Sequence, residues 1–421
     1  MIKKEYTNSE LNEKYIKAVL DNGLKIFVAE KKDYNSAYAV YGTKYGSVDV
    51  AFSCDGGDVH KVPAGIAHFL EHKLFESEDG DAFKKYAETG AYANAYTSFD
   101  KTCYLFSCTN RFEDNFKILL DFVQHPYFTQ ATVEKEQGII GQEIRMYDDS
   151  PDWCVLFDML SSMYHNNPVK VDIAGTVESI RQINADLLYD CYNTFYNPSN
   201  MFICVAGNVD ADRIIEMAQQ SVSGKKSVKI SRYFDDEPQT VVRKYTEKKL
   251  QVSMPQFCFG FKQNGGNPSV KDNLAINFLM RIAVGSASDL YRTLTEKGLI
   301  NDKFNFEYFS GDNYAVPMFS GESADPKEVA KAIINEFNRL KSEGIDESLL
   351  EAVRREAYGD TVKGYDSIEN IVSSFIDAAM NDYGVFDEID IIKNITSKDL
   401  QEYLNIFDEE KSVLSVILPR E

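Results

Sequence analysis

Apolar and polar residues alternate in some stretches of the chain, and apolar residues recur every three or four positions in others. Residues 36–52 and 248–262 read SAYAVYGTKYGSVDVAF and KKLQVSMPQFCFGFK, which predicts β-strands. Residues 330–344 read AKAIINEFNRLKSEG, a helical pattern that ends on Gly344 as a suitable cap. Strands and helices interleave, and several strands look antiparallel, so the pattern predicts an α+β fold.

One stretch of sequence recurs about half a chain later. Residues 183–195 read INADLLYDCYNTF and residues 395–407 read ITSKDLQEYLNIF, with isoleucine, leucine, asparagine and phenylalanine at matching places. A strand-like run follows each stretch, MFICVAG in the first case and VLSVILP in the second. A duplicated unit explains both the length of the chain and the order of its elements.

The joint between the two units is predicted at residues 221–245. This stretch is polar and charged and has no helical periodicity, which is typical of a linker. We therefore expect a first domain over residues 1–220, the linker, and a homologous second domain over residues 246–421.

Composition narrows the class of protein. A chain of 421 residues that is 44% hydrophobic, with 11 prolines, indicates packed globular domains. No apolar run reaches the roughly 18 residues that a membrane span needs, and the N-terminal stretch lacks the apolar core of a signal peptide. The seven scattered cysteines indicate free thiols in a reducing compartment, so we expect a cytoplasmic protein without membrane insertion. The net charge of −21 argues against a nucleic-acid partner.

The candidate chemistry lies in residues 65–76, GIAHFLEHKLFE. His68 and His72 are four positions apart, so on a helix both imidazoles project from one face towards a shared metal ion. Glu71 shares that face and can hold a water molecule beside the metal. This H-x-x-E-H order reverses the commoner H-E-x-x-H zinc helix. The pattern predicts a zinc site on His68 and His72 with Glu71 as the general base; two histidines on an exposed helix are the alternative.

A zinc site for hydrolysis needs a third protein ligand and an open position for water. Residues 134–149, EKEQGIIGQEIRMYDD, follow a helical pattern and carry Glu136 and Glu143 on one face, ~10 Å apart along the axis. One of these carboxylates is expected to bind the metal and the other to lie just outside it. The spacing alone does not say which.

The two stretches GIAHFLEHKLFE and KEQGIIGQEIRMYDD together resemble the pitrilysin/insulinase family of inverted-motif zinc peptidases. The resemblance is to its half-size branch, which includes mitochondrial processing peptidase. In that family the later glutamate is the zinc ligand, which implies Glu143, and the earlier one, Glu136, is a catalytic helper. The family fold is two homologous α+β domains, each a mostly antiparallel sheet packed with helices, in agreement with the repeat.

Residues 90–108, GAYANAYTSFDKTCYLFSC, predict a hairpin that turns near Asp100 and Lys101. In the family the corresponding edge strand, here with Asn94 and Ala95, pairs with an extended peptide substrate through main-chain hydrogen bonds. The resemblance thus implies a zinc endopeptidase in which the metal activates water and Glu71 transfers its proton to the leaving amine.

The second half of the chain departs from the family pattern. Active members carry an arginine and a tyrosine in a stretch resembling L-R-E-K-x-G-L-x-Y, whereas residues 290–302 read LYRTLTEKGLIND. Thr295 stands at the arginine position, Asn301 at the tyrosine position, and Arg292 lies three residues early. In some bacterial half-size members a paralogue without the zinc motif supplies this pair. The resemblance therefore favours such a heterodimer over a homodimer.

Two other functions stay open. The first is a non-catalytic structural or scaffold subunit, as in the respiratory-complex core proteins of the family. The intact set of two histidines and three glutamates argues against it. The second is a maturation protease dedicated to one small peptide, which the sequence does not separate from general peptide hydrolysis.

Overall fold

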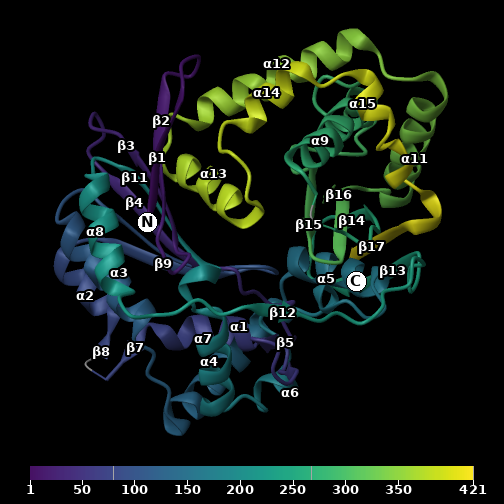
Figure 1. Cartoon of the computed structure of the whole chain (residues 1–421). Coiled ribbons are helices and arrows are strands. Elements are labelled where there is room, and N and C mark those ends of the chain that lie inside the picture. The colour runs from purple at the N-terminus through teal and green to yellow at the C-terminus, as the bar shows by residue number, and fades with distance from the viewer. Residues whose placement is uncertain (79, 267, 421) are drawn as a thin grey trace. The chain divides into compact units, whose positions relative to one another are not determined.

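The computed structural model describes residues 1–78, 80–266 and 268–420 (Figure 1). The chain forms two compact units, and each takes one segment from the other half of the sequence. Unit 1 comprises Met1–Ile144, Asp172–Tyr233 and Val362–Val385, and unit 2 comprises Arg145–Val171, Phe234–Thr361 and Phe386–Glu421. The step from Tyr233 to Phe234 falls within the polar stretch 221–245.

Unit 1 is built on a seven-stranded sheet with the order β1-β2-β3-β11-β4-β10-β9. Its strands are β1 Ile2–Asn8, β2 Glu13–Val19, β3 Lys25–Glu30, β4 Ala37–Thr43, β9 Tyr92–Thr97, β10 Thr102–Cys108 and β11 Met201–Gly207. The pairing of β3 with β11 is parallel and the others are antiparallel. All residues of the central strand β11 are buried, whereas β9 lies at an edge and alternates between exposed and partly buried residues. Smaller sheets pair β12 Ile230–Arg232, β5 Ala51–Cys54 and β6 His60–Lys61, and β7 Glu76–Ser77 with β8 Gly80–Asp81.

Helices pack on both faces of this sheet. They are α1 Ile66–Leu74, α2 Ala82–Thr89, α3 Phe112–Gln124, α4 Gln130–Asp148, α6 Val177–Ile180, α7 Ala185–Phe195, α8 Ala211–Ser221 and α13 Ile368–Asn381, with a 3₁₀ turn at Pro198–Asn200. Helix α13 comes from late in the sequence and lies against β11 and β4 (Figure 1). Phe27 of β3 stacks on its Phe375 with ring centroids 5.7 Å apart, whereas the neighbouring Ile26 and Val28 point into the core on the other face. This alternation is the two-residue period of a strand buried on both sides.

Unit 2 is built on a five-stranded sheet with the order β13-β17-β14-β16-β15. Its strands are β13 Tyr245–Leu250, β14 Gln256–Phe261, β15 Asn305–Gly311, β16 Tyr314–Glu322 and β17 Ser412–Pro419. Its helices are α5 Pro151–Met163, α9 Val270–Val284, α10 Asp289–Glu296, α11 Pro326–Glu343, α12 Glu347–Gly364, α14 Asp387–Asn394 and α15 Ser397–Gln401, with 3₁₀ turns at Pro168–Lys170, Leu404–Ile406 and Glu409–Lys411. Helix α5, from the first half of the sequence, packs on β17, β14 and β13 (Figure 1).

The two sheets repeat one topology. Strand β11 is parallel to β3 and antiparallel to β4, and β17 is parallel to β13 and antiparallel to β14. In each unit two further antiparallel strands, β10 and β9 or β16 and β15, complete that side of the sheet. The duplicated runs MFICVAG and VLSVILP form the equivalent strands β11 and β17. The predicted α+β fold with two homologous domains is therefore confirmed.

Several local expectations are also confirmed. Helix α11 ends at Gly344, which has a positive φ of 87°, and β9 and β10 form the predicted hairpin, with Thr97 opposite Thr102. The seven cysteines are free thiols. Within the ranges that the structure describes, none of the helices is both long enough and apolar enough to span a bilayer.

Candidate metal centre

The histidine motif forms helix α1, whose orientation is fixed by burial of its apolar face. The residues buried on this helix include Ile66, Ala67, Phe69, Leu70 and Leu74. The helix begins after Gly65, which has a φ of 88°, and a Cβ there would lie 2.3 Å from the carbonyl oxygen of Ala174. Only glycine fits such a positive φ and such a close approach. The histidine-bearing face of α1 is thereby directed towards helix α4.

Helix α4 places Glu143 opposite both histidines. Nε2 of His68 lies 3.7 Å from Oε1 of Glu143, and Nε2 of His72 lies 3.5 Å from Oε2 of the same carboxylate. Among the described residues, these form the one group of three or more His, Cys, Asp or Glu side chains whose potential ligand atoms all lie within 4.8 Å of one another. Ligands about 2.1 Å from a tetrahedral zinc ion are about 3.4 Å apart, so the donor atoms and their spacing fit zinc.

Glu136 lies on the same helix but has a different contact. Its Oε1 is 3.0 Å from Nδ1 of His72, the ring nitrogen on the opposite side from Glu143. A carboxylate at this position accepts the Nδ1 proton, which fixes the tautomer and leaves the Nε2 lone pair free for a metal. The structure thus separates the two glutamates: Glu143 faces both histidines, and Glu136 orients one of them.

Burial sets the charge of the two imidazoles differently. For His68, burial and then the neighbouring His72 lower the pKa to about 3, so this ring is neutral near pH 7. Burial also opposes the charge on His72, but the hydrogen bond to Glu136 and the surrounding carboxylates outweigh it, and its pKa is raised. Because metals bind the neutral ring, His68 is already in its binding form, whereas binding at a protonated His72 releases a proton.

Glu71 is held by a residue that the sequence reasoning did not single out. Its Oε2 accepts a 2.7 Å hydrogen bond from the hydroxyl of Thr97 at the end of strand β9, and its side chain is buried. Burial raises the pKa of Glu71, although the Thr97 bond and His72 act in the opposite direction. A raised pKa suits a carboxylate that takes and returns a proton near neutral pH. The sequence could have pointed to Thr97 through the segment NAYTS, in which Thr97 closely follows Asn94 and Ala95 of the predicted substrate strand.

Replacing Thr97 by valine is expected to lower peptide turnover roughly tenfold, because a hydrogen bond to a charged group is lost. Thr97→Ser keeps the hydroxyl and is expected to restore turnover. Zinc content should be unchanged in both variants, since the Thr97 hydroxyl bonds to Glu71 and lies 3.3 Å from the Thr102 hydroxyl. Equal turnover of Thr97→Val and the wild type would contradict the assigned role.

Strand β9, which carries Asn94 and Ala95, pairs with β10 on one side and lies at the edge of the sheet on the other. Asn94 is opposite Leu105, and Ala95 is opposite Tyr104. Helix α1 packs against β9, so this edge runs beside the histidine motif. An edge strand offers backbone N–H and C=O groups to a further strand, which is how extended peptides are commonly bound.

Thr295 and Asn301, at the positions where the family pattern has arginine and tyrosine, and the nearby Arg292 all make local contacts within unit 2. Arg292 of α10 is exposed and pairs with Asp289 at 2.7 Å. The Thr295 hydroxyl donates to a backbone carbonyl one turn earlier, and the Asn301 amide donates to a nearby carboxylate at 2.9 Å. Neither of these last two side chains carries a cation or a phenol that could substitute for the missing pair.

Comparison with known proteins shows the family. Residues 44–177 match the family described as "Insulinase (Peptidase family M16)", and residues 182–357 match "Peptidase M16 inactive domain". The chain is 42% identical over 410 residues to "Uncharacterized zinc protease YmfH" of Bacillus subtilis (strain 168), covering 95% of each protein. It superimposes on the structure described as "Crystal structure of putative M16-like peptidase from Alicyclobacillus acidocaldarius" with a TM-score of 0.93 and 35% identity, covering 96% of this chain and 98% of that one. The chain belongs to the M16 peptidase family, as the resemblance in its sequence indicated.

Similarity also extends to a protein of another kind. The chain is 26% identical over 228 residues to "Cytochrome b-c1 complex subunit 1, mitochondrial" of Mus musculus, covering 52% of this chain and 44% of that protein. The proteins similar to this chain therefore include one named as a subunit of a respiratory complex, beside proteins named zinc proteases.

Proposed function

We propose that this chain is a zinc-dependent endopeptidase that hydrolyses peptides or extended polypeptide segments. The observation that carries the proposal is the convergence of His68, His72 and Glu143 at separations that suit one tetrahedral zinc ion, with Glu71 on the same helix as the histidines. Relatives named as zinc proteases support it.

Each residue of the site has a distinct task in this proposal. A zinc ion held by the two histidines and Glu143 would supply Lewis acidity, which acidifies water and polarises a carbonyl. Glu71 removes a proton from the attacking water and delivers it to the leaving amine nitrogen. Glu136 keeps His72 in the required tautomer through its 3.0 Å contact.

The substrate is held by its main chain. A peptide that adds to the free edge of β9 at Asn94 and Ala95 runs beside α1, which carries Glu71. Backbone pairing of this kind depends little on side-chain identity, so the proposal predicts broad sequence tolerance. The direct test is hydrolysis of an internally quenched peptide before chelation, after chelation and after zinc is returned. Hydrolysis that persists in the zinc-free protein would contradict the proposal.

Glu136 and Glu143 are expected to separate when each is changed to glutamine. Glu143→Gln should lose most of its zinc, because an anionic ligand is removed. Glu136→Gln should keep zinc better and lose turnover roughly 10- to 100-fold, as expected for a group that orients a ligand. Glu134→Gln is the matched control, because Glu134 is an exposed glutamate on the same helix. Loss of zinc from Glu136→Gln but not from Glu143→Gln would reverse the two assignments.

We further propose that the chain is the zinc-bearing subunit of a heterodimer, with a paralogue that lacks the zinc motif but supplies arginine and tyrosine. The support is that Thr295 and Asn301 stand at the two positions where the family pattern has this pair. A missing transition-state donor typically costs ~10²-fold or more in rate. We therefore expect the lone chain to bind zinc but cleave peptides slowly.

Mixing with such a paralogue should raise turnover by a similar factor and give a larger species on size-exclusion chromatography. Each chain alone serves as the control for the mixture. Full activity of the lone chain, unchanged by the partner, would contradict the divided site and would favour a homodimer.

A scaffold role is the second candidate, because the chain is similar over half its length to a mouse cytochrome b-c1 subunit. The scaffold role predicts no zinc-dependent hydrolysis, with or without a paralogue. Zinc retention together with hydrolysis in the mixture would exclude it.

A further inference from the structure

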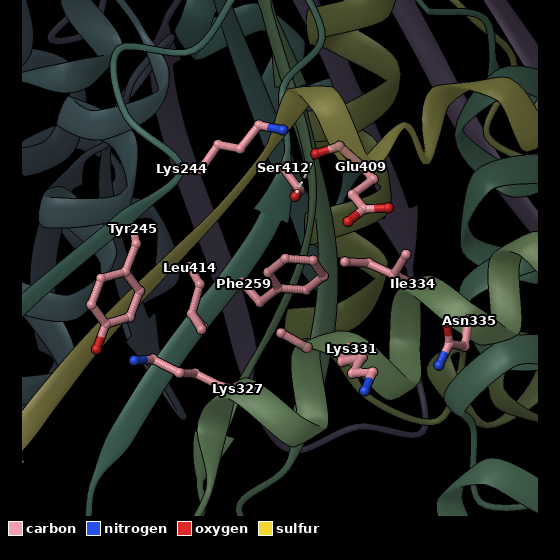
Figure 2. A pocket seen from close by; sticks show the side chains of 11 residues that line it. Lys244, Tyr245, Phe259, Lys327, Lys331, Ile334, Asn335, Glu409, Ser412 and Leu414 are labelled. Carbon is pink, nitrogen blue, oxygen red and sulfur yellow. Dashed lines mark hydrogen bonds between the residues drawn. The ribbon is translucent and has the colours of Figure 1, made fainter.

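Unit 2 contains a pocket of about 530 Å³ between its sheet and helix α11 (Figure 2). This volume is within the range of roughly 300–1,000 Å³ typical of small-ligand sites. The pocket is lined by the buried side chains of Phe259 of β14, Leu414 of β17 and Ala330 of α11, and by the partly buried Ile334 of α11. The polar residues Asn335, Ser412 and Glu409 also line it. All these residues belong to unit 2, so the pocket is independent of the metal centre.

Three lysines line this apolar pocket, although the chain has a net charge of −21. Lys244 is paired with Glu410 at 2.8 Å. Lys327 lies over the Tyr245 ring, 4.4 Å from its centroid, and Lys331 is one helical turn further along α11. Among the described residues, neither Lys327 nor Lys331 has a carboxylate within 4.0 Å. Figure 2 shows both side chains on the same side of the Phe259 ring.

Two effects act against the positive charges of this pair, and Glu328 in the first turn of α11 offsets part of them. Lys327 is in the first turn of α11, where the helix dipole favours anions and disfavours cations. Like charges four positions apart on a helix also repel each other. An anion bound near these two lysines would offset both effects.

We propose that this pocket binds the C-terminal end of a peptide whose last residue is apolar or aromatic. The carboxylate lies between Lys327 and Lys331, and the last side chain packs on Phe259 and Leu414. Lysine ammonium groups attract a carboxylate as point charges. None of the described residues that line the pocket is an arginine. The Ser412 hydroxyl donates to the Glu409 carbonyl at 2.8 Å, so its oxygen can accept a hydrogen bond. This oxygen and the Asn335 amide can bond the last peptide group, which a fatty acid does not have.

The test measures binding of acetyl-Ala-Ala-Phe to the whole chain by isothermal titration calorimetry, with the zinc removed by a chelator. We expect the peptide carboxylate to bind at least about tenfold more tightly than the peptide amide, because a charge-assisted contact is lost in the amide. Acetyl-Ala-Ala-Ser should bind more weakly than acetyl-Ala-Ala-Phe, because it lacks the apolar side chain.

Variants of Lys331 localise the binding to the pocket. Lys331→Gln should weaken binding of acetyl-Ala-Ala-Phe at least about tenfold, and Lys331→Arg should retain it. Lys297→Gln, at an exposed lysine after α10, is the matched control and should bind as the wild type does. Unchanged thermal unfolding of all three variants would show that they fold normally.

Three results would overturn the proposal. The first is equal binding of the carboxylate and the amide, and the second is wild-type affinity in Lys331→Gln. The third is tight binding of decanoate together with no binding of the peptide, which would make the pocket a site for fatty acids.

Discussion

Replacing His72 with alanine is expected to remove both the bound zinc and the peptide hydrolysis, whether the chain is assayed alone or with a partner. In the proposed site His72 supplies one of the three ligand atoms, and its ring also has the contact to Glu136. Losing a ligand leaves two protein donors, too few for the three that hydrolytic zinc sites use. Zinc per chain is measured by mass spectrometry of the purified protein, in parallel with turnover.

His125→Ala is the matched control for this change. His125 is an exposed histidine at the end of α3, and its ring contacts a backbone carbonyl of its own helix. It should keep both zinc and activity. Equal zinc content in His72→Ala and His125→Ala would refute the metal assignment.

Glu71→Gln is expected to keep its zinc, unlike His72→Ala, but to lose activity to a similar extent. Glutamine keeps the size of the side chain and an oxygen that can accept the Thr97 hydrogen bond, but it does not take up a proton from water. Zinc should therefore stay bound while turnover falls by ~10²-fold or more. Zinc content and turnover of Glu71→Gln are measured on the same preparation.

A fall in both zinc and turnover would assign Glu71 to the metal rather than to proton transfer. Retained turnover would show that another group is the base. The zinc-loaded Glu71→Gln protein also provides an inactive form for measuring peptide binding along β9.

The part of the site that lies on one helix could be predicted from the sequence. The direction of two side chains four positions apart depends only on helical geometry, so His68 and His72 were paired without knowledge of the fold. Glu136 and Glu143 could not be assigned from spacing, because both lie on one face of α4. What distinguishes them is the packing of α4 against α1, which puts Glu143 at the two Nε2 atoms and Glu136 at Nδ1 of His72.

The pattern of apolar and polar residues did not predict which distant segments contact each other. The repeat predicted two equivalent sheets, because duplicated strands keep the same neighbours. Periodicity shows that α5 and α13 have apolar faces, but not that each packs on a sheet built largely from the other half of the sequence. In the same way, the contact between Thr97 and Glu71 depends on how the β9–β10 hairpin lies against α1.

X-ray absorption spectroscopy at the zinc edge of the purified wild-type chain tests the proposed metal site without depending on a partner or on activity. We expect one zinc ion per chain with two imidazole nitrogens and one or two oxygens at about 2.0–2.2 Å. A chain without zinc, or zinc with a sulfur ligand at about 2.3 Å, would contradict it.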